Sequence, residues 1–199
     1  MTTWEEHQAW ERRWWGNCTN TFAEEVKQLT YAHRMGLVIT KHPEFYETWP
    51  LYDMMGKTVV DIGGGPVSML LKTMNLGEWS CVIDPCEYPK WVYDRYCVAN
   101  IVPRRRPGEA DIGGEFDEAW IYNVLQHVQD PAKIVANARK VARIVRVFEW
   151  INRGTGIGHP HSLTEEGMNA FVGGKGRTEQ LQGENGCWGW AYYGVFAGL

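Results

Sequence analysis

Three consecutive glycines follow an aspartate in the segment VVDIGGGPVSML, residues 59–70. The valines before Asp61 are typical of a strand, and Pro66 with the apolar residues after it predicts the start of a helix. Glycines at such a turn allow a ligand to lie against the backbone, and free N–H groups at a helix start can bind its polar atoms. The segment indicates a ligand-binding turn, and a tight turn without a ligand is the alternative.

The spacing of the glycines differs from two common nucleotide motifs. A dinucleotide fingerprint has the form G-x-G-x-x-G, whereas Val67 stands where a glycine would be required after Gly63 and Gly65. A phosphate-binding loop places a lysine directly after its last glycine, whereas Pro66 follows the run that includes Gly64. The glycines are therefore expected to hold a ligand in another way.

Polar residues also follow the later predicted strands. Asp84 and Pro85 end the second strand in VIDP, about twenty residues after the glycines, where a carboxylate can accept hydrogen bonds from both ribose hydroxyls. Glu109 follows the third strand and can accept from an adenine amino group, while the backbone N–H of Ala110 meets a ring nitrogen. Asn123 ends the fourth strand. Because the carboxyl ends of parallel strands meet at one edge, these residues predict a nucleoside site.

Three histidines are candidates for acid–base chemistry or substrate contact. His127 follows the fourth strand in NVLQHV, and His159 and His161 lie in the loop GHPHSLT after the fifth. His127 and His161 are the candidate catalytic residues, with capping or packing as the alternative for His127. His159 is a candidate for contact with the substrate. A metal held by His159 and His161 would lack a third ligand, so no metal site is predicted.

Alternating strands and helices must position these residues. Strands are predicted at 58–62, 79–84, 101–105, 117–124, 142–151, 178–183 and 188–197. Helices are predicted at 66–75, 88–97 and 130–141, and from about Thr164. This alternation predicts a parallel sheet covered by helices on both faces, and the last two strands, joined by the turn residues ENG, predict a closing hairpin.

The N-terminal quarter is predicted to be helical. Thr2 and Thr3 each stand three residues before a glutamate, which is the spacing of a capping box and predicts a helix up to Gly16. Thr21 with Glu24 predicts a second helix in the same way. The apolar stripe of that second helix is expected to consist of Phe22, Val26 and Leu29. A short third helix is predicted at residues 43–49.

Composition places the chain among soluble globular proteins. Its 199 residues are 44% hydrophobic and 22% charged, and a formal net charge of −4 gives no reason to expect nucleic acid or an anionic membrane as partner. No stretch approaches the roughly 18 apolar residues of a membrane span, and the first residues lack the apolar core of a signal peptide. The five cysteines form no CxxC pair and predict reduced thiols and a cytoplasmic location. The sequence carries no signal for an oligomeric state.

Together, these motifs resemble those of the class I S-adenosylmethionine-dependent methyltransferases. VVDIGGGP is similar to their first motif, VIDP to their acidic second motif and FDEAWIYNVLQHVQDP to their fourth-strand motif. ARIVRVFEWI is similar to the fifth strand and the closing hairpin to the last two strands, so the resemblance covers residues 56–199. Val67 departs from the usual last glycine. The resemblance implies a Rossmann-like α/β fold with a seven-stranded, mostly parallel sheet, an antiparallel C-terminal hairpin strand and an N-terminal helical cap.

The resemblance also implies a cofactor and a division of the chain. S-adenosylmethionine, with S-adenosylhomocysteine as product, would be held by Asp61, Gly63, Gly64, Gly65, Asp84, Pro85, Glu109, Ala110 and Asn123. Residues 1–55 would form a cap or lid on a core of residues 56–199, within one compact domain. The acceptor would be enclosed by the N-terminal helices and the loops after the fourth and fifth strands. The expected pocket residues are Trp14, Trp15, Tyr122 and His159, with core packing as the alternative for the tryptophans.

Missing motifs narrow the acceptor. Amino-methylating DNA enzymes carry Asn/Asp-Pro-Pro-Tyr/Phe at the end of the fourth strand, whereas here a valine follows Asn123. Cytosine C5 enzymes carry a Pro-Cys nucleophile at the same place, whereas the Pro-Cys of this chain, Pro85 and Cys86, follows the second strand. Residues 14–37 resemble methyltransferases of bacteria and their phages. We predict methyl transfer to a small polar molecule, with O-methylation of a sugar or metabolite as the specific hypothesis. A nucleobase or RNA methyltransferase that contacts phosphate through residues 104–106 and a cofactor-binding accessory protein without catalysis are the alternatives.

Overall fold

The computed structural model describes residues 3–40 and 51–199. The helix predicted at residues 43–49 lies outside this part of the chain. The α-helices are α1 (Trp4–Trp15), α2 (Thr21–Arg34), α3 (Lys90–Val98), α4 (Pro131–Val141) and α5 (Glu165–Val172). The 3₁₀ helices are η1 (Gly65–Val67), η2 (Met69–Lys72), η3 (Leu125–His127) and η4 (Glu184–Gly186). The strands are β1 (Ile39–Thr40), β2 (Leu51–Asp53), β3 (Val59–Ile62), β4 (Thr73–Met74), β5 (Cys81–Ile83), β6 (Val102–Arg104), β7 (Phe116–Tyr122), β8 (Ala142–Ile151), β9 (Arg177–Gln182) and β10 (Trp188–Ala197).

Seven strands form the main sheet, in the order β6-β5-β3-β7-β8-β10-β9. The pairs β6–β5, β5–β3, β3–β7 and β7–β8 are parallel, and β10 pairs antiparallel with both β8 and β9. The parallel strands consist largely of apolar residues because the sheet is buried on both faces, and all four residues of β3 are buried. This sheet confirms the predicted Rossmann-like α/β fold with an antiparallel C-terminal strand.

The strand order reverses between β3 and β7. From β3 the chain proceeds outward through β5 to β6, and from β7 it proceeds the other way to β8. Ligands of open α/β sheets bind in the crevice at the carboxyl ends of the strands beside such a reversal. The glycines at 63–65, Asp84 and Asn123 follow β3, β5 and β7 and therefore lie along this crevice.

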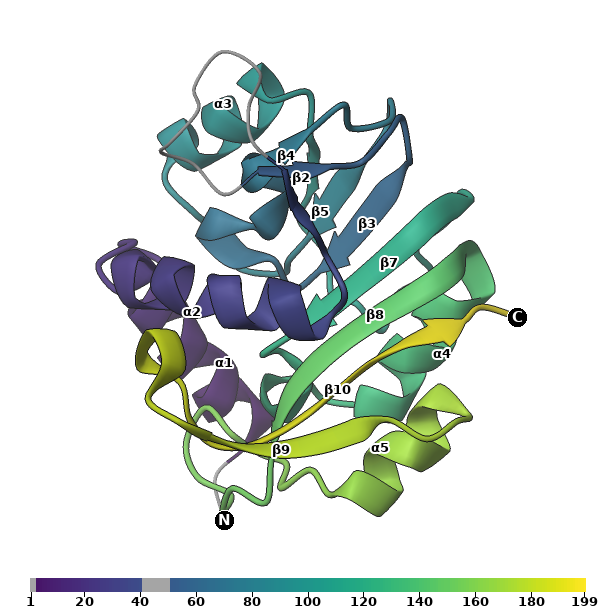
Figure 1. Ribbon diagram of the computed structural model, residues 1–199. Coiled ribbons are helices and arrows are strands. Elements are labelled where there is room, and N and C mark those ends of the chain that lie inside the picture. Colours follow the sequence, from purple (N-terminus) through teal and green to yellow (C-terminus); the bar gives the residue numbers. More distant parts are fainter. Residues whose placement is uncertain (1–2, 41–50) are drawn as a thin grey trace.

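Helices cover both faces of the sheet (Figure 1). α2 crosses one face, where Tyr31 stacks on Phe148 of β8 with ring centroids 4.3 Å apart. α4 and α5 cover the opposite face, and their Ile134 and Met168 belong to its buried apolar cluster. Each fully buried side chain of this size contributes roughly 1.5–3 kcal/mol to folding. α1 lies at the edge where β7 and β8 end, so it reaches the crevice rather than the sheet's faces (Figure 1).

The two N-terminal helices begin differently. Thr3 caps α1 in the predicted capping box: its Oγ1 accepts from the N–H of Glu6 (3.3 Å) and its own N–H donates to the Glu6 carboxylate (2.7 Å). At the start of α2, Asn20 is the N-cap residue and the hydroxyl of Thr21 donates to the Cys18 carbonyl. The capping role predicted for Thr21 is therefore wrong.

The buried face of α2 also differs from the predicted apolar stripe. Phe22 is 78% exposed, whereas Glu24 and Gln28 are buried. Gln28 donates to the Val67 carbonyl at 2.7 Å and accepts from Lys72 at 2.8 Å. The stripe prediction is wrong because the N-terminal half of α2 faces the crevice, where polar side chains have partners, and only its C-terminal half packs on the sheet.

The helix predicted at residues 66–75 does not form. Ser68 is extended (φ −49°, ψ 142°) and separates η1 from η2, and β4 follows directly. The N–H of Ser68 donates to the Tyr96 hydroxyl (3.0 Å), and its Oγ accepts from the N–H of Leu70 (3.0 Å). These contacts with the rest of the fold override the helical pattern of the segment. β4 instead joins β1 and β2 in a small second sheet.

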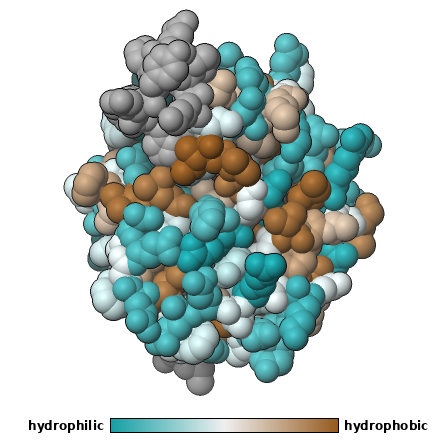
Figure 2. All heavy atoms as spheres, in the orientation of Figure 1, coloured by the Kyte–Doolittle hydropathy of each residue, from teal (hydrophilic) through white to brown (hydrophobic). Residues whose placement is uncertain are grey.

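The surface on the side of α2 is mainly hydrophilic. Figure 2 shows an apolar strip just above the helix and hydrophilic side chains below it. No helix among residues 3–40 and 51–199 is both long and apolar enough to cross a membrane. All five cysteines, among them the exposed Cys97, are free thiols.

Candidate functional site

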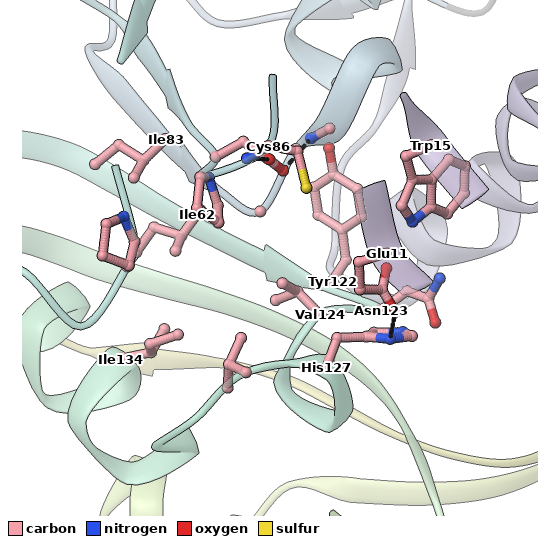
Figure 3. Close-up of a pocket in the computed structure, with 18 of the residues that line it drawn as sticks. Glu11, Trp15, Ile62, Ile83, Cys86, Tyr122, Asn123, Val124, His127 and Ile134 are labelled. Carbon is pink, nitrogen blue, oxygen red and sulfur yellow. Dashed lines mark hydrogen bonds and ion pairs between the residues drawn. The ribbon is translucent and has the colours of Figure 1, made fainter. Parts of the chain in front are cut away.

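A cavity of about 330 Å³, the first cavity, lies at the carboxyl edge of the sheet. Residues that follow β3, β5, β6 and β7 form its base, and side chains of α1 and α2 cover it. Ile62 and Ile134 lie at one end (Figure 3). Trp15 and His127 lie at the other end (Figure 3). The cavity therefore has an apolar end and an end with aromatic and polar groups.

The predicted glycine turn lines the first cavity. Gly63 has a φ of 78°, and a Cβ there would lie 2.1 Å from Cγ2 of Val124. A Cβ on Gly64 would lie 2.5 Å from Oδ2 of Asp61. A larger residue would force away either the Val124 wall or the carboxylate beneath the turn. The glycines thus allow the backbone of the turn to lie close to Val124 and to the Asp61 carboxylate.

Asp61 lies beneath the turn rather than in the cavity. It is fully buried, and its Oδ2 accepts from the Ser68 hydroxyl and from the Tyr122 hydroxyl (2.5 Å). Burial raises the pKa of its carboxyl to about 7, although both hydrogen bonds oppose the shift. Asp61 does not line the first cavity, so the structure places it as a support for the turn and not in contact with the cavity's contents.

Asp84 and Pro85 line the cavity beside the turn. Oδ2 of Asp84 accepts from the N–H of Gly65 (3.1 Å), and Oδ1 accepts from the N–H of Cys86 (2.8 Å) and the Tyr88 hydroxyl (3.0 Å). Burial raises the pKa of this carboxyl despite these donors. Asp84 thus ties the end of β5 to the glycine turn while one side of it faces the cavity.

Glu109 and Ala110 are placed differently from each other. Glu109 lines the cavity, and its carboxylate accepts from the backbone N–H groups of Gln129 (2.9 Å) and Asp130 (3.2 Å). Ala110 does not line the cavity, and its N–H donates to the Pro107 carbonyl at 3.1 Å. The expectation that this N–H meets a ring nitrogen is therefore not supported, because the group already has a partner.

Several lining residues carry no chemical signal in the sequence. Ile62, Ile83, Pro107 and Ile134 enclose the apolar end of the cavity. As apolar residues at strand ends and in a helix they are indistinguishable from core residues by pattern alone. Together they form a slot suited to a flat apolar group such as a purine ring.

Apart from His127, the ionisable side chains that line the first cavity and carry charge near neutral pH are acidic. Its lining includes the carboxylate residues Glu11, Glu24, Asp84 and Glu109. Within the described part of the chain no lysine or arginine lines it. A lining of this kind favours a cationic ligand and disfavours phosphate groups.

A second cavity of about 310 Å³ adjoins the first. Its lining contains five tryptophans: Trp10, Trp14, Trp15, Trp150 and Trp188. Trp14 stacks on Trp10 with ring centroids 5.0 Å apart, and the ring centroid of His159 lies 6.3 Å from that of Trp10. Trp14, Trp15 and His159, all predicted as pocket residues, therefore meet in one cavity, and Trp15 also faces the first.

Four residues line both cavities: Trp15, Glu24, Asn123 and His127. We call this group the shared wall. Asn123 adopts a left-handed backbone (φ 54°), which is uncommon outside glycine, and its Nδ2 donates to Oε1 of Glu24 at 3.1 Å. Burial raises the pKa of Glu24, which the sequence predicts only as part of a helix start. The shared wall thus carries groups that can position or accept a proton.

His127 is held by α1 and by the loop after β8. Its Nδ1 lies 2.8 Å from Oε1 of Glu11 and 2.7 Å from the Gly158 carbonyl, and both of these are acceptors, so Nδ1 carries the proton (Figure 3). Burial lowers the pKa of His127, but the hydrogen bond and charge of Glu11 outweigh it, so that the pKa is raised overall. His159 packs on this ring at 4.5 Å, and burial and the charge of His127 lower its own pKa.

A further acid lies beneath the shared wall. Glu149 of β8 is fully buried, and its Oε1 accepts from the N–H groups of Val124 (2.9 Å) and Leu125 (3.0 Å). Burial raises its pKa to about 7, and its other oxygen has no hydrogen-bond partner within the protein. Glu149 therefore fixes the turn that carries Asn123 and His127, and nothing in the sequence distinguishes it from a surface glutamate in a strand.

Two predicted residues have their polar groups turned away from both cavities. Tyr122 lines the first cavity, but its hydroxyl donates to Asp61 and accepts from the N–H of Met69 at 3.0 Å. His161 lines neither cavity, and its Nε2 donates to the carbonyl of Val128 at 2.9 Å. The structure thus brings His127 to the shared wall and leaves His161 outside it. Among residues 3–40 and 51–199, no group of His, Cys, Asp and Glu could hold a metal ion.

No known protein-family profile matches the sequence, and no curated protein sequence matches it. Solved structures do match. A chain in the complex between the Haloferax volcanii Trm112 methyltransferase activator and a methyltransferase has a TM-score of 0.57 at 10% identity, covering 90% of this chain and 94% of that one. The 1,6-didemethyltoxoflavin-N1-methyltransferase of Burkholderia thailandensis, with bound 1,6-didemethyltoxoflavin and S-adenosylhomocysteine, has a TM-score of 0.53 at 14% identity over 71% of each chain.

A third match is the magnesium protoporphyrin IX methyltransferase of Synechocystis PCC 6803 with bound SAM, with a TM-score of 0.52 at 13% identity over 71% of each chain. At such identities the likeness concerns the fold. This chain therefore has the class I S-adenosylmethionine-dependent methyltransferase fold, which confirms the resemblance of its motifs.

Proposed function

We propose that this protein is an S-adenosylmethionine-dependent methyltransferase, which binds the cofactor in the first cavity and a small polar acceptor in the second. The observation that carries the proposal is the shared wall: one cavity lies on the ligand-binding edge of the fold, and a second of similar size opens beside it across Asn123 and His127.

The residues of the first cavity fit this cofactor. Its acidic lining suits a sulfonium cation and does not suit a dinucleotide phosphate. The slot around Ile62 and Ile134 would hold the adenine, with Glu109 at its margin. Asp84, which lines the cavity beside the glycine turn, would accept from the ribose hydroxyls. The glycine turn, which lines the cavity beside Asp84, would lie against the amino acid portion.

When bound, S-adenosylmethionine supplies a methyl group on a sulfonium, which a nucleophile attacks in line. The chain's own part is to align the acceptor and to exclude water, and alignment alone can contribute effective molarities of about 10⁵ M or more. Asn123 and Trp15 would orient the acceptor at the shared wall. Nδ1–H of His127 donates to Glu11, so its Nε2 is unprotonated. This Nε2 lies 3.2 Å from the amide nitrogen of Gln126, a donor that an acceptor hydroxyl would displace in order to give its proton to His127. This arrangement favours transfer to oxygen, and a sugar or metabolite hydroxyl is the proposed acceptor group.

We also propose that the segment 1–55 contributes the lid, mainly through α1. Trp4, Glu11 and Trp15 of α1 cover the first cavity. α2, in contrast, packs on the sheet through Tyr31 and belongs as much to the core as to the cover. The lid would exclude water from the transfer step.

The RNA alternative receives less support. Arg104 and Arg106 both donate to the Ile112 carbonyl, and Arg105 pairs with Glu87 at 3.3 Å. These groups are thus engaged within the protein and not gathered toward a phosphate backbone. The small-molecule acceptor is a part of the proposal that goes beyond the fold. So is a cytoplasmic location, which the free cysteines suggest.

Titration calorimetry with S-adenosylhomocysteine and with NAD⁺ tests the cofactor. We expect binding of S-adenosylhomocysteine and none of NAD⁺; the reverse would overturn the proposal. Transfer of a labelled methyl group from S-adenosylmethionine to a panel of small hydroxyl compounds and to RNA then tests the acceptor class. If the label appears in RNA and not in the small molecules, the RNA alternative is favoured. Tight cofactor binding without transfer to any acceptor would favour an accessory protein.

A further inference from the structure

The second cavity has a chemical character of its own, and this inference rests on its proposed role as the acceptor site. Its walls come from five parts of the chain: α1, the first half of α2 with the turn before it, the turn after β7, the end of β8 with the loop after it, and the turn between β9 and β10 with the start of β10. Segments so distant in sequence meet here around a space of about 310 Å³. A site of this volume accommodates one or two rings.

The tryptophans of this cavity are incompletely covered. Trp14 is 43% exposed and Trp188 is 64% exposed, while Trp150 is buried at the inner side. Exposed indoles gathered at one opening form an apolar surface of the kind that marks a binding site. Because an indole presents a flat face, a flat ring is the group that covers most of this surface with good contact.

The charged groups of the second cavity are mainly cationic. Lys27 and Arg153 line it, together with the single acid Glu24. Arg153 donates to the Trp188 carbonyl at 2.7 Å and lies 4.7 Å above the Trp150 ring. Within the described residues no carboxylate lies at ion-pair distance from Arg153, and the Nζ of Lys27 is 4.0 Å from the Glu24 carboxylate. Both cations therefore retain donors that a ligand can use.

We propose that the acceptor is a flat-ringed anion, whose ring packs among the tryptophans of the second cavity and whose anionic group is bound by Arg153 and Lys27. A carboxylate and a phosphate ester share this chemistry. The nucleophilic group then points to His127 of the shared wall, beyond which lies the first cavity.

Binding of defined probes in the presence of saturating S-adenosylhomocysteine tests the inference. The probes are 4-hydroxybenzoate and anthranilate, their neutral amides, phenyl phosphate, and glucuronate as an anion without a flat ring. Quenching of tryptophan fluorescence reports occupancy. We expect at least one ring anion to bind about tenfold or more tightly than its neutral amide and than glucuronate, as one charge-assisted hydrogen bond provides. Preference for the carboxylates or for phenyl phosphate identifies the anionic group.

Two variants and a matched control locate the binding. Arg153→Gln and Lys27→Gln should each weaken the ring anion by about tenfold and leave its amide within about twofold. Arg143→Gln removes an arginine at the opposite end of β8 and should change neither the binding of the ring anion nor that of its amide. Equal binding of anions and amides, or variants that affect both alike, would overturn the inference while calorimetry with S-adenosylhomocysteine still upholds the proposed function. Loss of the S-adenosylhomocysteine signal in the unaltered protein would instead overturn the proposed function.

Discussion

The two cavities share a wall yet carry opposite charge. The first is lined by four carboxylate residues and by no described lysine or arginine, whereas the second has Lys27 and Arg153 against Glu24 alone. Their apolar surfaces differ as well, since isoleucines enclose one end of the first and tryptophans surround the second. Two adjoining sites of opposite charge cannot easily exchange ligands, because each would repel the ligand of the other.

The difference teaches where each cavity obtains its specificity. The first is built mainly from strand ends and the turns that follow them, which are fixed by the sheet. The second is built largely from α1 and from loops, which the sheet does not dictate. The proposed cofactor site is therefore a property of the fold, and the proposed acceptor site is a property of this particular chain.

Removing residues 1–20 is expected to have the largest effect and to separate the two cavities. The deletion removes Trp10 and Trp14 from the second cavity, Trp15 from the shared wall and the α1 cover from the first cavity. Methyl transfer should be abolished, while calorimetry still detects weakened binding of S-adenosylhomocysteine. Circular dichroism must show an intact fold. Transfer at the full rate would contradict the proposal that α1 is the lid.

Gly63→Val is expected to close the first cavity alone. The new side chain would collide with Val124, and its backbone would be strained at φ 78°. Binding of S-adenosylhomocysteine should fall by about 100-fold or more, which corresponds to roughly 3 kcal/mol. Gly113→Val is the matched control, because Gly113 has a φ of 65° and nothing within 4 Å of its added Cβ. Equal loss of binding in both variants would show that strain, not contact, is responsible.

His127→Gln tests the shared wall. If His127 accepts the proton of the acceptor, kcat should fall by about 100-fold or more, as is typical for a general base. The affinity for S-adenosylhomocysteine, measured by calorimetry, should change little. His161→Gln is the control, since His161 lines neither cavity and should retain kcat. A similar kcat in both variants would remove His127 from the mechanism and favour an acceptor that loses its proton to water.

The fold and the cofactor edge could be predicted because their signals are local. β8 and β10 have the predicted bounds, since long β-branched and aromatic runs specify strands strongly. The glycine turn and Asp84 stand directly after strands, so sequence order places them at one edge. The segment at 66–75 shows the limit of this reasoning, because the conformation of Ser68 depends on Tyr96, which is remote in the sequence.

Trp15, Asn123 and His127 of the shared wall are candidates from the sequence, but the acids around them could not be predicted because they arrive there only through tertiary structure. Glu11 and Glu24 stand in helices, where glutamates are ordinarily solvated, and Glu149 stands in a strand. Nothing in their neighbours signals that they become buried around Asn123 and His127. Of the histidines, the sequence offers both His127 and His161 as catalytic candidates, and the path of the loop after β8 separates them.

Glu149→Gln should stabilise the protein above neutral pH. A carboxyl whose pKa is raised from 4.5 to about 7 by burial stabilises the folded state fully only below pH 4.5, and this contribution is lost as the pH rises through about 7. A glutamine amide can still accept from Val124 and Leu125 without the cost of a buried charge. Urea unfolding at pH 8 should show a gain of about 1–3 kcal/mol, with none at pH 4. The exposed Glu115→Gln serves as the control, and a gain that does not vary with pH would contradict this explanation.

Glu11→Gln is expected to have the smallest effect and gives the sharpest test of the shared wall. The glutamine oxygen can still accept from Nδ1 of His127, so the ring keeps its orientation, but the negative charge that helps to raise the pKa of His127 is gone. Transfer requires neutral His127, so the rate should rise with pH through that pKa. In Glu11→Gln the acid limb of the kcat profile should move to lower pH, as expected for the loss of an adjacent negative charge, with kcat at high pH nearly unchanged. Glu149, Glu24 and His159 also surround the ring and remain in place. A limb that does not move, or that moves to higher pH, would show that another group titrates and that the pair of Glu11 and His127 serves only to hold α1 over the cavities.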